Sequence, residues 1–309
     1  MNRRCFLQQT LSTAAVLTAA ARAQTSNSPA APPAPSAAEA PALIDTNIHL
    51  FDWPFRRLKY SRTADLVAKL RRHRVREAWA GSFEALLTKD VSGVNARLAE
   101  ECRGHPGFLI PIGTVNPAWP DWEEDLRRCH EVHRMPGIRL YPRYHGLAVN
   151  DPEMIRLLRL ATERGLLVQI ALELEDPRVH HPVLQLPPLD VGTIAQGLKA
   201  VPAARVQLLD CTFSFQLPIV QPLLDLANVT FDFSSFESVG ILDRLLNEKA
   251  GGRGTPIAPE RLLFGSHAPY FPVEAALLRL FESPLTRSQL EPLMAGNARR
   301  LLSAVSTAP

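Results

Sequence analysis

Cysteines are few in this sequence, and none of them forms a recognisable metal-binding motif. The chain of 309 residues has 4 cysteines, of which Cys5 lies near the N-terminus, while Cys102, Cys129 and Cys211 are widely separated. Neither a Cys-x-x-Cys pair nor the Cys/His spacing of a zinc ribbon occurs, which excludes structural zinc modules of those types. A chain of this length can bury a sizeable core and does not depend on disulfide bonds.

The sequence also lacks the short motifs of several large enzyme classes. It contains no P-loop, no Gly-x-Ser-x-Gly and no His-Glu-x-x-His, which argues against a P-loop nucleotidase, an α/β-hydrolase and a zincin-type protease. A Rossmann domain carries a glycine-rich turn after its first strand. The corresponding residues 49–58 contain no glycine, so dinucleotide binding of that type is excluded as well.

Beyond residue 23, the chain has no excess of charge of one sign. The sequence has 34 basic and 31 acidic residues, and its net charge of +3 comes from Arg3, Arg4 and Arg22. A chain without net charge or a basic block has no electrostatic basis for holding nucleic acid or an anionic membrane. We therefore expect a small-molecule substrate, and neither a nucleic-acid partner nor a membrane partner after processing. The sequence leaves open whether the chain forms a homo-oligomer.

Residues 1–23 have the pattern of an export signal. Arg3 and Arg4 precede an apolar stretch rich in alanine and threonine, and residues 21–23 form a small-x-small cleavage site. The arginine pair followed by this stretch is similar to a twin-arginine signal, with a Sec signal or an unprocessed anchor as the alternatives. We expect an exported, periplasmic protein.

A linker separates this signal from the folded domain. Residues 24–41 consist mainly of proline, alanine and serine, a composition that cannot form a packed core. The folded domain is therefore predicted over residues 42–309.

Within this domain, short apolar runs alternate with amphipathic helical patterns. The strand starts recur at roughly the length of one βα unit. Eight strands with helical connections in one domain of this size predict an α/β protein with a (β/α)8 TIM-barrel fold. The predicted strands cover residues 42–50, 76–82, 108–117, 137–142, 166–174, 205–212, 229–235 and 261–269.

Polar residues gather at the carboxyl ends of these strands, where TIM barrels carry their active sites. Asp45, Asn47 and His49 alternate along the first strand and therefore point to one face. They must satisfy one another or a ligand, because an unpaired buried polar group costs about 1–3 kcal/mol. Further candidates at the strand ends are Ser82, Asn116, Arg139, Tyr141, Arg143, His145, Glu173, Glu175, Asp176, Asp210, Asp232, Ser234, Ser266 and His267.

Four segments together resemble the amidohydrolase-related branch of the amidohydrolase superfamily, which includes decarboxylases and lactonases. They are IDTNIHLFD in the first strand, GIRLYP in the fourth, RLLFGSHAP in the eighth and the closing GNARRLL, in the expected order over residues 43–302. The resemblance implies a (β/α)8 barrel. It also implies a hydrolase that cleaves a C–O or C–N bond of a small substrate, which can carry a carboxylate, by means of activated water.

The resemblance further implies a divalent metal site, but the chain departs from the family pattern at several ligands. The family carries Asp-x-His-x-His on the first strand, a histidine on the fifth and often on the sixth, and an aspartate on the eighth. Here Asn47 stands in place of the first histidine and His267 in place of the aspartate. The fifth strand ends in Glu173 and the sixth in Asp210.

Three hypotheses therefore stay open, the first two with His49, Asp210 and His267 as catalytic residues. In the first, His49, His267 and Glu175, or Asp210 in its place, bind one zinc or manganese ion that activates water. In the second, a metal-free lactonase-like hydrolase, a histidine polarises the carbonyl and an aspartate activates water. In the third, the barrel has lost catalysis and binds a small molecule.

Substrate binding is assigned to polar residues around the predicted barrel mouth. Arginines there can hold a substrate carboxylate, and Asn47 is expected to orient a neighbour or the substrate. Of the adjacent His180 and His181, the second is preferred because Pro182 restricts its backbone, although the whole loop 175–182 can also be a solvated turn. The candidates are Asn47, Arg139, Tyr141, His145, Arg178 and His181.

Aromatic residues follow the first and eighth predicted strands. They form either a rim over the pocket or an ordinary packed loop. They are Phe51, Trp53, Phe55, Tyr270 and Phe271.

Overall fold

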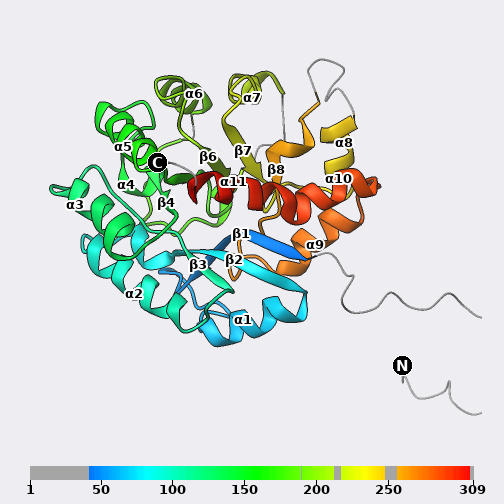
Figure 1. The fold of residues 1–309 in the computed structure, drawn as a ribbon, viewed down its shortest axis with the longest axis horizontal. Coiled ribbons are helices and arrows are strands. Elements are labelled where there is room, and N and C mark those ends of the chain that lie inside the picture. The colour runs from blue at the N-terminus through cyan, green and yellow to red at the C-terminus, as the bar shows by residue number, and fades with distance from the viewer. Residues whose placement is uncertain (1–41, 189, 212–216, 248–255, 307–309) are drawn as a thin grey trace, which may run out of the picture. The chain divides into compact units, whose positions relative to one another are not determined.

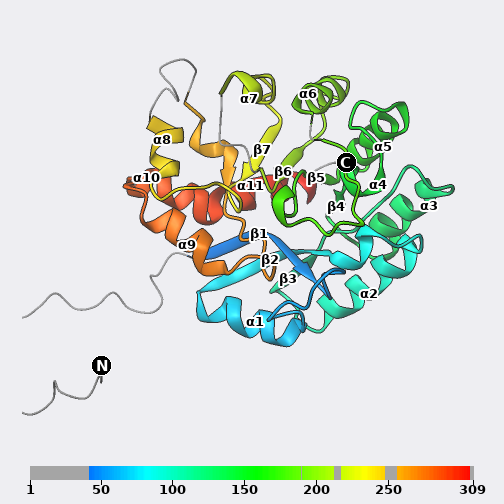
Figure 2. The same cartoon turned by 180° about the vertical axis from the view of Figure 1, so that it is seen from behind.

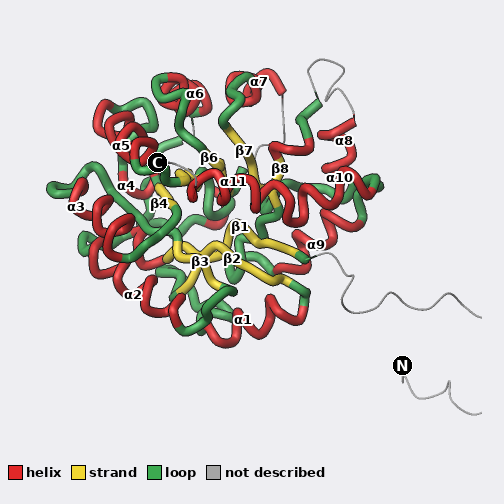
Figure 3. Tube along the Cα trace, in the orientation of Figure 1, coloured by secondary structure: helices red, strands yellow, loops and turns green. Residues whose placement is uncertain are grey.

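Parallel strands lie at the centre of the folded domain, and helices surround them (Figures 1 and 3). The computed structural model describes residues 42–188, 190–211, 217–247 and 256–306. The predicted export signal and linker lie outside these residues. The strands within the described ranges are β1 (Leu43–Leu50), β2 (Val75–Ser82), β3 (Leu109–Pro111), β4 (Gly137–Leu140), β5 (Leu167–Ala171), β6 (Val206–Leu209), β7 (Val229–Asp232) and β8 (Leu262–Leu263).

The strands follow one another in chain order, and each pairs in parallel with the next. β1-β2-β3 form one sheet, and β4-β5-β6-β7-β8 form a second. A parallel bridge between Ile48 and Ala268 joins β1 to the chain beyond β8, and another between Gly113 and Ile138 joins the chain beyond β3 to β4. The two sheets therefore meet at both edges, and the predicted (β/α)8 barrel is confirmed.

Helices with an apolar stripe connect the strands on the outside of the barrel (Figure 2). In α5, for example, Met154, Leu157, Leu158 and Ala161 are buried, and Asp151 caps the first turn by accepting a hydrogen bond from the Glu153 N–H. Among the described helices, none is long and apolar enough to cross a membrane. The helices are α1 (Thr63–Arg72), α2 (Val91–Arg103), α3 (Trp122–Arg127), α4 (Pro142–His145), α5 (Pro152–Glu163), α6 (Val191–Lys199), α7 (Leu217–Leu224), α8 (Ile241–Asn247), α9 (Val273–Phe281), α10 (Arg287–Glu291) and α11 (Asn297–Ser306).

The C-terminal helix α11 covers the amino end of the barrel. Its Ala298, with the preceding Ala295, packs against Ile44 of β1, Leu167 of β5 and Leu263 of β8. Asn297 donates hydrogen bonds from Nδ2 to the carbonyl oxygens of Pro259 (2.7 Å) and Leu262 (2.6 Å). The closing GNARRLL segment thus ties the last strand to the rest of the domain.

The carboxyl end of the barrel is covered by a second apolar cluster, rich in aromatic residues. It joins residues that follow β1, β2, β4, β5 and β8, so it lies over the strand ends where the polar candidates gather. Its main members are Trp53, Leu58, Phe83, Leu86, Tyr141, Leu174 and Tyr270.

Replacement of Asn297 by alanine should destabilise the domain. Two carbonyl groups would lose their donor, so the free energy of unfolding should fall by about 1–3 kcal/mol. Urea unfolding followed by circular dichroism measures this. Asn247→Ala is the matched control, because Asn247 is exposed at the end of α8 and its loss should cost less than about 0.5 kcal/mol. Equal losses of the free energy of unfolding in the two variants would contradict a stabilising role for the two Asn297 hydrogen bonds.

Candidate functional site

A layer of polar side chains crosses the interior of the barrel beneath its carboxyl end. Arg139 of β4 pairs in register with Gln169 of β5, which pairs with Gln207 of β6. Arg139 Nε donates to Gln169 Oε1 (2.9 Å), and Gln169 Nε2 donates to Gln207 Oε1 (2.8 Å). Adjacent positions in a parallel sheet point the same way, so the register itself produces this chain of hydrogen bonds.

The Arg139 guanidinium is fully buried, and its donors are engaged by the protein. Nη1 donates to the Ile48 carbonyl (2.8 Å) and lies 3.3 Å from Asn47 Oδ1, and Nη2 donates to the Trp79 carbonyl (3.2 Å). A Cβ atom at Gly81 would lie 2.7 Å from Nη1, so glycine at this position of β2 makes room for the cation. Burial lowers the pKa of Arg139 from its ordinary value, while neighbouring aspartates favour the charged form.

Asn47 connects this buried cation to two buried aspartates. Its Nδ2 donates to Asp210 Oδ1 (2.7 Å) and to Asp232 Oδ2 (2.8 Å), while its Oδ1 faces Arg139. These contacts fix the orientation of the amide, because the acceptor side faces a cation and the donor side faces carboxylates. Asn47, which stands where the family pattern has a histidine, therefore aligns Asp210 and Asp232.

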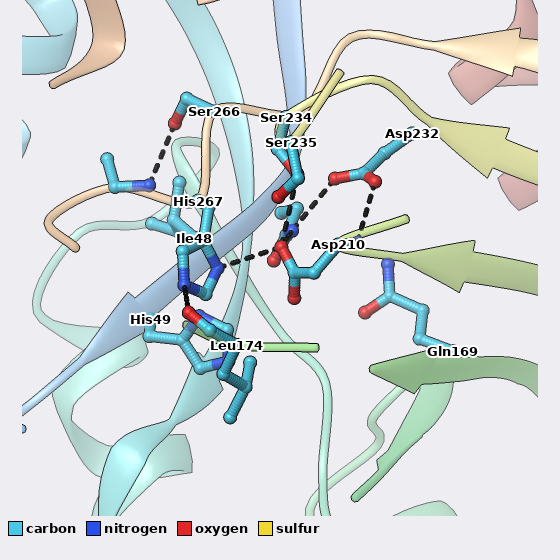
Figure 4. Close-up of polar contacts among 12 residues, drawn as sticks. Ile48, His49, Gln169, Leu174, Asp210, Asp232, Ser234, Ser235, Ser266 and His267 are labelled. Atoms are coloured by element: carbon cyan, nitrogen blue, oxygen red, sulfur yellow. Dashed lines mark hydrogen bonds and ion pairs between the residues drawn. The ribbon is translucent and has the colours of Figure 1, made fainter. Parts of the chain in front are cut away.

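Asp210 and His267 form a buried pair at the ends of β6 and β8 (Figure 4). Both side chains are 0% exposed, and Nδ1 of His267 lies 2.9 Å from Oδ1 of Asp210. The contact is an ion pair by distance, but the ring N–H direction is not aligned for a hydrogen bond. Asp210 Oδ1 also accepts from Ser234 Oγ (3.1 Å). Asp210 Oδ2 is buried and has no partner among the described residues.

An acceptor lies opposite each ring nitrogen of His267. Its Nε2 lies 2.9 Å from the Leu174 carbonyl oxygen, which can only accept. Its Nδ1 faces a carboxylate oxygen, which also accepts unless it is protonated. A hydrogen on Nε2 would be donated to the Leu174 carbonyl and would point away from the pair.

Two backbone positions of this pair lie in the left-handed region. Asp210 has φ of 56° and His267 has φ of 55°. Residues other than glycine adopt this region at a cost of order 1 kcal/mol or more, and such residues cluster at functional sites. The backbone N–H of Asp210 donates to Asp232 Oδ1 (2.9 Å), which helps to hold this conformation. Burial, followed by the charge of Asp210, raises the pKa of Asp232 to about 7.

His49 is the third predicted catalytic residue, and it packs beside the pair as a neutral ring. It stacks on Phe83 with ring centroids 4.4 Å apart and meets His267 edge-on at 5.2 Å. Burial, followed by the charges of Arg139 and His267, holds the pKa of His49 well below its ordinary value. His49 therefore contacts the pair as a neutral neighbour.

The predicted metal ligands His49, His267 and Glu175 are not arranged as a metal centre. In the described part of the chain, no group of three or more His, Cys, Asp or Glu side chains is placed to hold a metal ion. Arg139 Nη1 lies 3.2 Å from His49 Nε2, and the amide N–H groups of Asn47 point to the carboxylates. A guanidinium and amide donors at these positions repel a cation, so the residues present do not fit the divalent centre.

The predicted substrate-binding residues divide into buried and exposed groups. Tyr141 is buried, and its hydroxyl lies 3.5 Å from the Ser82 carbonyl. His145 Nε2 lies 3.0 Å from the Ala85 carbonyl. Arg178 is exposed and paired with Asp176 of its own loop. In a separate contact, the exposed His181 stacks on Phe55 at 5.2 Å. The structure thus brings Asn47 and Arg139 to the Asp210–His267 pair and leaves Arg178 and His181 at the surface.

Gln169 and Gln207 were missed by sequence reasoning, although the sequence contains a signal for them. Each stands in the middle of an apolar strand, in Val-Gln-Ile and Val-Gln-Leu. A polar residue that interrupts two neighbouring strands at the same register predicts a buried ladder of hydrogen bonds. The Leu174 carbonyl has no such signal, because its approach to His267 depends on the path of a loop.

Asp45 is the buried carboxyl whose titration is easiest to isolate. Its Oδ1 accepts from the N–H groups of Asn47 (3.2 Å) and Ser266 (2.9 Å), and its Oδ2 has no partner among the described residues. Burial raises the pKa of Asp45 from 3.8 to about 7, against smaller opposing effects of the Ser266 and Asn47 hydrogen bonds and of Arg139. An asparagine can keep the accepting oxygen and mimic the protonated carboxyl.

We expect Asp45→Asn to stabilise the domain in a pH-dependent way. A raised pKa in the folded state means that the stability contributed by Asp45 is present below pH 3.8 and is lost as the pH rises to about 7. The advantage of the variant should therefore grow over that window by at most about 1.4 kcal/mol per pH unit and then level off. Urea unfolding at several pH values tests this, with the exposed Asp225→Asn as control. A difference that does not change with pH would refute the raised pKa.

Comparison with known proteins supports the fold and the family. Residues 44–208 match the amidohydrolase family model. No curated protein matches the chain. Three solved structures illustrate the likeness, and their low sequence identity means that they show the fold alone.

The amidohydrolase 2 of Bifidobacterium longum subsp. infantis is 18% identical, with a TM-score of 0.57 over 86% of this chain and 100% of that chain. The 5-carboxyvanillate decarboxylase of Sphingomonas paucimobilis is 13% identical, with a TM-score of 0.63 over 85% and 99%. A dihydroxybenzoic acid decarboxylase of a Polaromonas species, with bound manganese, is 13% identical, with a TM-score of 0.62 over 87% and 98%.

The manganese belongs to that structure, and no group of side chains placed to hold a metal ion is found in the described part of this chain. The family model spans more than half of the sequence, and the fold, the strand-end site and the family model agree. The chain therefore belongs to the amidohydrolase family and is an amidohydrolase-related enzyme built on a (β/α)8 barrel.

Proposed function

We propose that this enzyme hydrolyses an ester or lactone of a small molecule, with Asp210 activating the water and His267 polarising the carbonyl. The observation that carries the proposal is the buried Asp210–His267 pair. One carboxylate oxygen contacts the imidazole at 2.9 Å, and the other has no partner among the described residues. A free carboxylate oxygen next to a ring N–H donor is the arrangement that hydrolysis of a carbonyl compound needs.

Asp210 is held so that only one of its oxygens is available for chemistry. Asn47 and Ser234 donate to Oδ1, at 2.7 and 3.1 Å, and fix the plane of the carboxylate. Oδ2 is then free to accept a proton from a water molecule as that water attacks the carbonyl carbon. The same proton passes to the leaving alkoxide, which gives a carboxylic acid and an alcohol and restores Asp210.

His267 supplies the electrophilic part of the reaction. Its Nε2–H points to the Leu174 carbonyl at 2.9 Å, and a substrate carbonyl can take the place of this backbone oxygen. The N–H group then stabilises the negative charge that develops on the substrate oxygen, as in an oxyanion hole. His49, neutral and edge-on to His267, helps to hold the ring in position.

Arg139 supplies the fixed positive charge of the site. Three aspartates, Asp45, Asp210 and Asp232, are fully buried around it, and it reaches two of them through Asn47. Its donors are taken by backbone and side-chain oxygens, so we assign it a positioning role in place of the expected contact with a substrate carboxylate. A zinc or manganese ion would have to displace this guanidinium.

Decarboxylation, the activity named for two of the similar structures, is less favoured by the geometry. A substrate carboxylate next to Asp210 and Asp232 would be repelled, and Arg139 has no donor to offer it. The non-catalytic alternative does not account for a strained pair with a free carboxylate oxygen.

We also propose that the enzyme acts after export to the periplasm. The proposal rests on Arg3, Arg4 and the small-x-small site at residues 21–23. The twin-arginine route carries folded proteins, so the domain would fold before it leaves the cytoplasm.

Asp210→Asn and His267→Gln should each lower kcat by at least about 100-fold, since general acid–base groups contribute about 10²–10⁴-fold. The measurement is the initial rate on a panel of small esters and lactones, with circular dichroism to confirm folding. Asp65→Asn on the exposed side of α1 and His105→Gln at the end of α2 are matched controls that should keep wild-type rates.

Two outcomes would overturn the proposal. Undiminished turnover by folded His267→Gln would remove the histidine from the mechanism. No turnover of any ester or lactone by the wild-type enzyme, at pH values on both sides of neutrality, would reject this reaction class.

A further inference from the structure

Three buried polar atoms in the aromatic cover over the catalytic pair have no partner among the described residues. They are Nε1 of Trp53, Oη of Tyr144 and Oε1 of Glu175. Trp53 and Glu175 are only 3% and 2% exposed. Most buried polar groups in proteins are hydrogen-bonded, so each exception calls for an explanation. Three exceptions in one cluster point to a common cause.

The three residues lie together. The Trp53 ring meets Tyr144 and Tyr270 edge-on, with centroids 6.4 and 5.1 Å apart. The Tyr270 hydroxyl donates to Glu175 Oε2 at 2.9 Å, which leaves the other carboxylate oxygen free. Burial, followed by the charge of Glu175, raises the pKa of Tyr144.

The cluster adjoins the catalytic pair. The Tyr270 ring lies 5.1 Å from His267. On the other side, Trp53 meets Phe83 at 5.1 Å, and Phe83 stacks on His49. A substrate whose carbonyl replaces the Leu174 oxygen on His267 would therefore extend toward Trp53, Tyr144 and Glu175.

We infer that Trp53, Tyr144 and Glu175 form a recognition subsite for a hydroxyl group on a flat ring of the substrate. The inference rests on the proposed function for the position of the reacting carbonyl. A hydroxyl group accepts from the Trp53 N–H and donates to the Glu175 carboxylate, while Tyr144 can do either. The rings of Trp53 and Tyr270 provide apolar walls that suit a planar body.

The charges around the subsite select a neutral group. A carboxylate or phosphate at this end would be repelled by Glu175. An ammonium group would compete with Arg56, whose guanidinium lies 4.5 Å from the Tyr270 ring centroid and 3.9 Å from Glu175 Oε2. The carboxylate therefore already has a cation on its outer side, and its free oxygen is left for a neutral donor.

A matched pair of probes tests the subsite, namely phenyl acetate and 4-hydroxyphenyl acetate. The wild-type enzyme should prefer the hydroxylated ester by at least about 10-fold in kcat/KM, since a site built to bond a hydroxyl discriminates against an analogue that lacks it. Tyr144→Phe removes only the hydroxyl oxygen and keeps the ring, whereas Trp53→Phe removes the indole N–H together with part of the ring. Tyr144→Phe should raise KM for the hydroxylated ester more than KM for the plain ester, and Trp53→Phe should reduce the preference for the hydroxylated ester.

Thermal unfolding separates recognition from a structural role. Removal of a hydroxyl that has no partner among the described residues should leave the Tm of Tyr144→Phe equal to or above that of the wild type. Tyr60→Phe is the control, because Tyr60 packs against the main core and not against this cluster. A lower Tm of Tyr144→Phe together with equal losses for both esters would show that the Tyr144 hydroxyl only supports the fold, and would overturn the inference.

A binding measurement tests the subsite independently of the proposed hydrolysis. Phenol, and toluene as its non-hydroxylated counterpart, are added to wild type, Trp53→Phe and His267→Gln, and the shift in Tm is recorded. We expect phenol to raise the Tm of wild type and His267→Gln more than toluene does, and the difference to vanish in Trp53→Phe. This result without ester turnover would uphold the subsite and reject the proposed hydrolysis. Turnover without any preference for the hydroxyl would reject the subsite alone.

Discussion

The burial of one guanidinium inside the barrel is the interaction on which the rest of the site depends. Arg139 is 0% exposed and lies among fully buried aspartates. A cluster of buried carboxylates without a cation is strongly unfavourable. The guanidinium offsets part of this cost and also bonds the carbonyl groups of β1 and β2. The same side chain therefore holds strands together and sets the charge of the site.

Asn47 connects Arg139 to the Asp210–His267 pair. Its carbonyl oxygen faces the cation and its amide N–H groups hold Asp210 and Asp232, so the replacement of a family histidine by asparagine has a definite structural use. The cost of the arrangement is visible in the left-handed backbone of Asp210 and His267 and in the raised pKa of Asp232, about 7. Strain and perturbed titration occur together where the chemistry is proposed.

The fold could be predicted from the sequence because its signals are periodic and local. Apolar runs and helical stripes placed all the strands, although β8 is only Leu262–Leu263 and the predicted run was longer, since the chain there continues as a loop with a single bridge to β1. Position at a strand end also identified His49, Asp210 and His267 as neighbours. The family resemblance was confirmed by the family model.

Side-chain partners could not be predicted in the same way, because they depend on distances between segments far apart in the chain. Arg139 was expected at a substrate carboxylate, and it lies with its donors engaged inside the barrel. Glu175 was expected beside His49 and His267 as a ligand, and it bonds Tyr270. The loop after β5 carries Arg178 and His181 to the surface, because the Asp176–Arg178 pair closes the turn on itself. The sequence pattern contains no information on such loop paths.

The central claim is that the Asp210–His267 pair activates water while Arg139 supplies the positive charge, without a metal ion. It is tested most directly by measuring the metal content of the exported form by mass spectrometry, after purification without chelator, together with ester and lactone turnover on the same sample. The account predicts full turnover at a zinc, manganese and iron content far below one ion per chain. Retention of one ion per chain, with loss of turnover on its removal and recovery on its return, would contradict it.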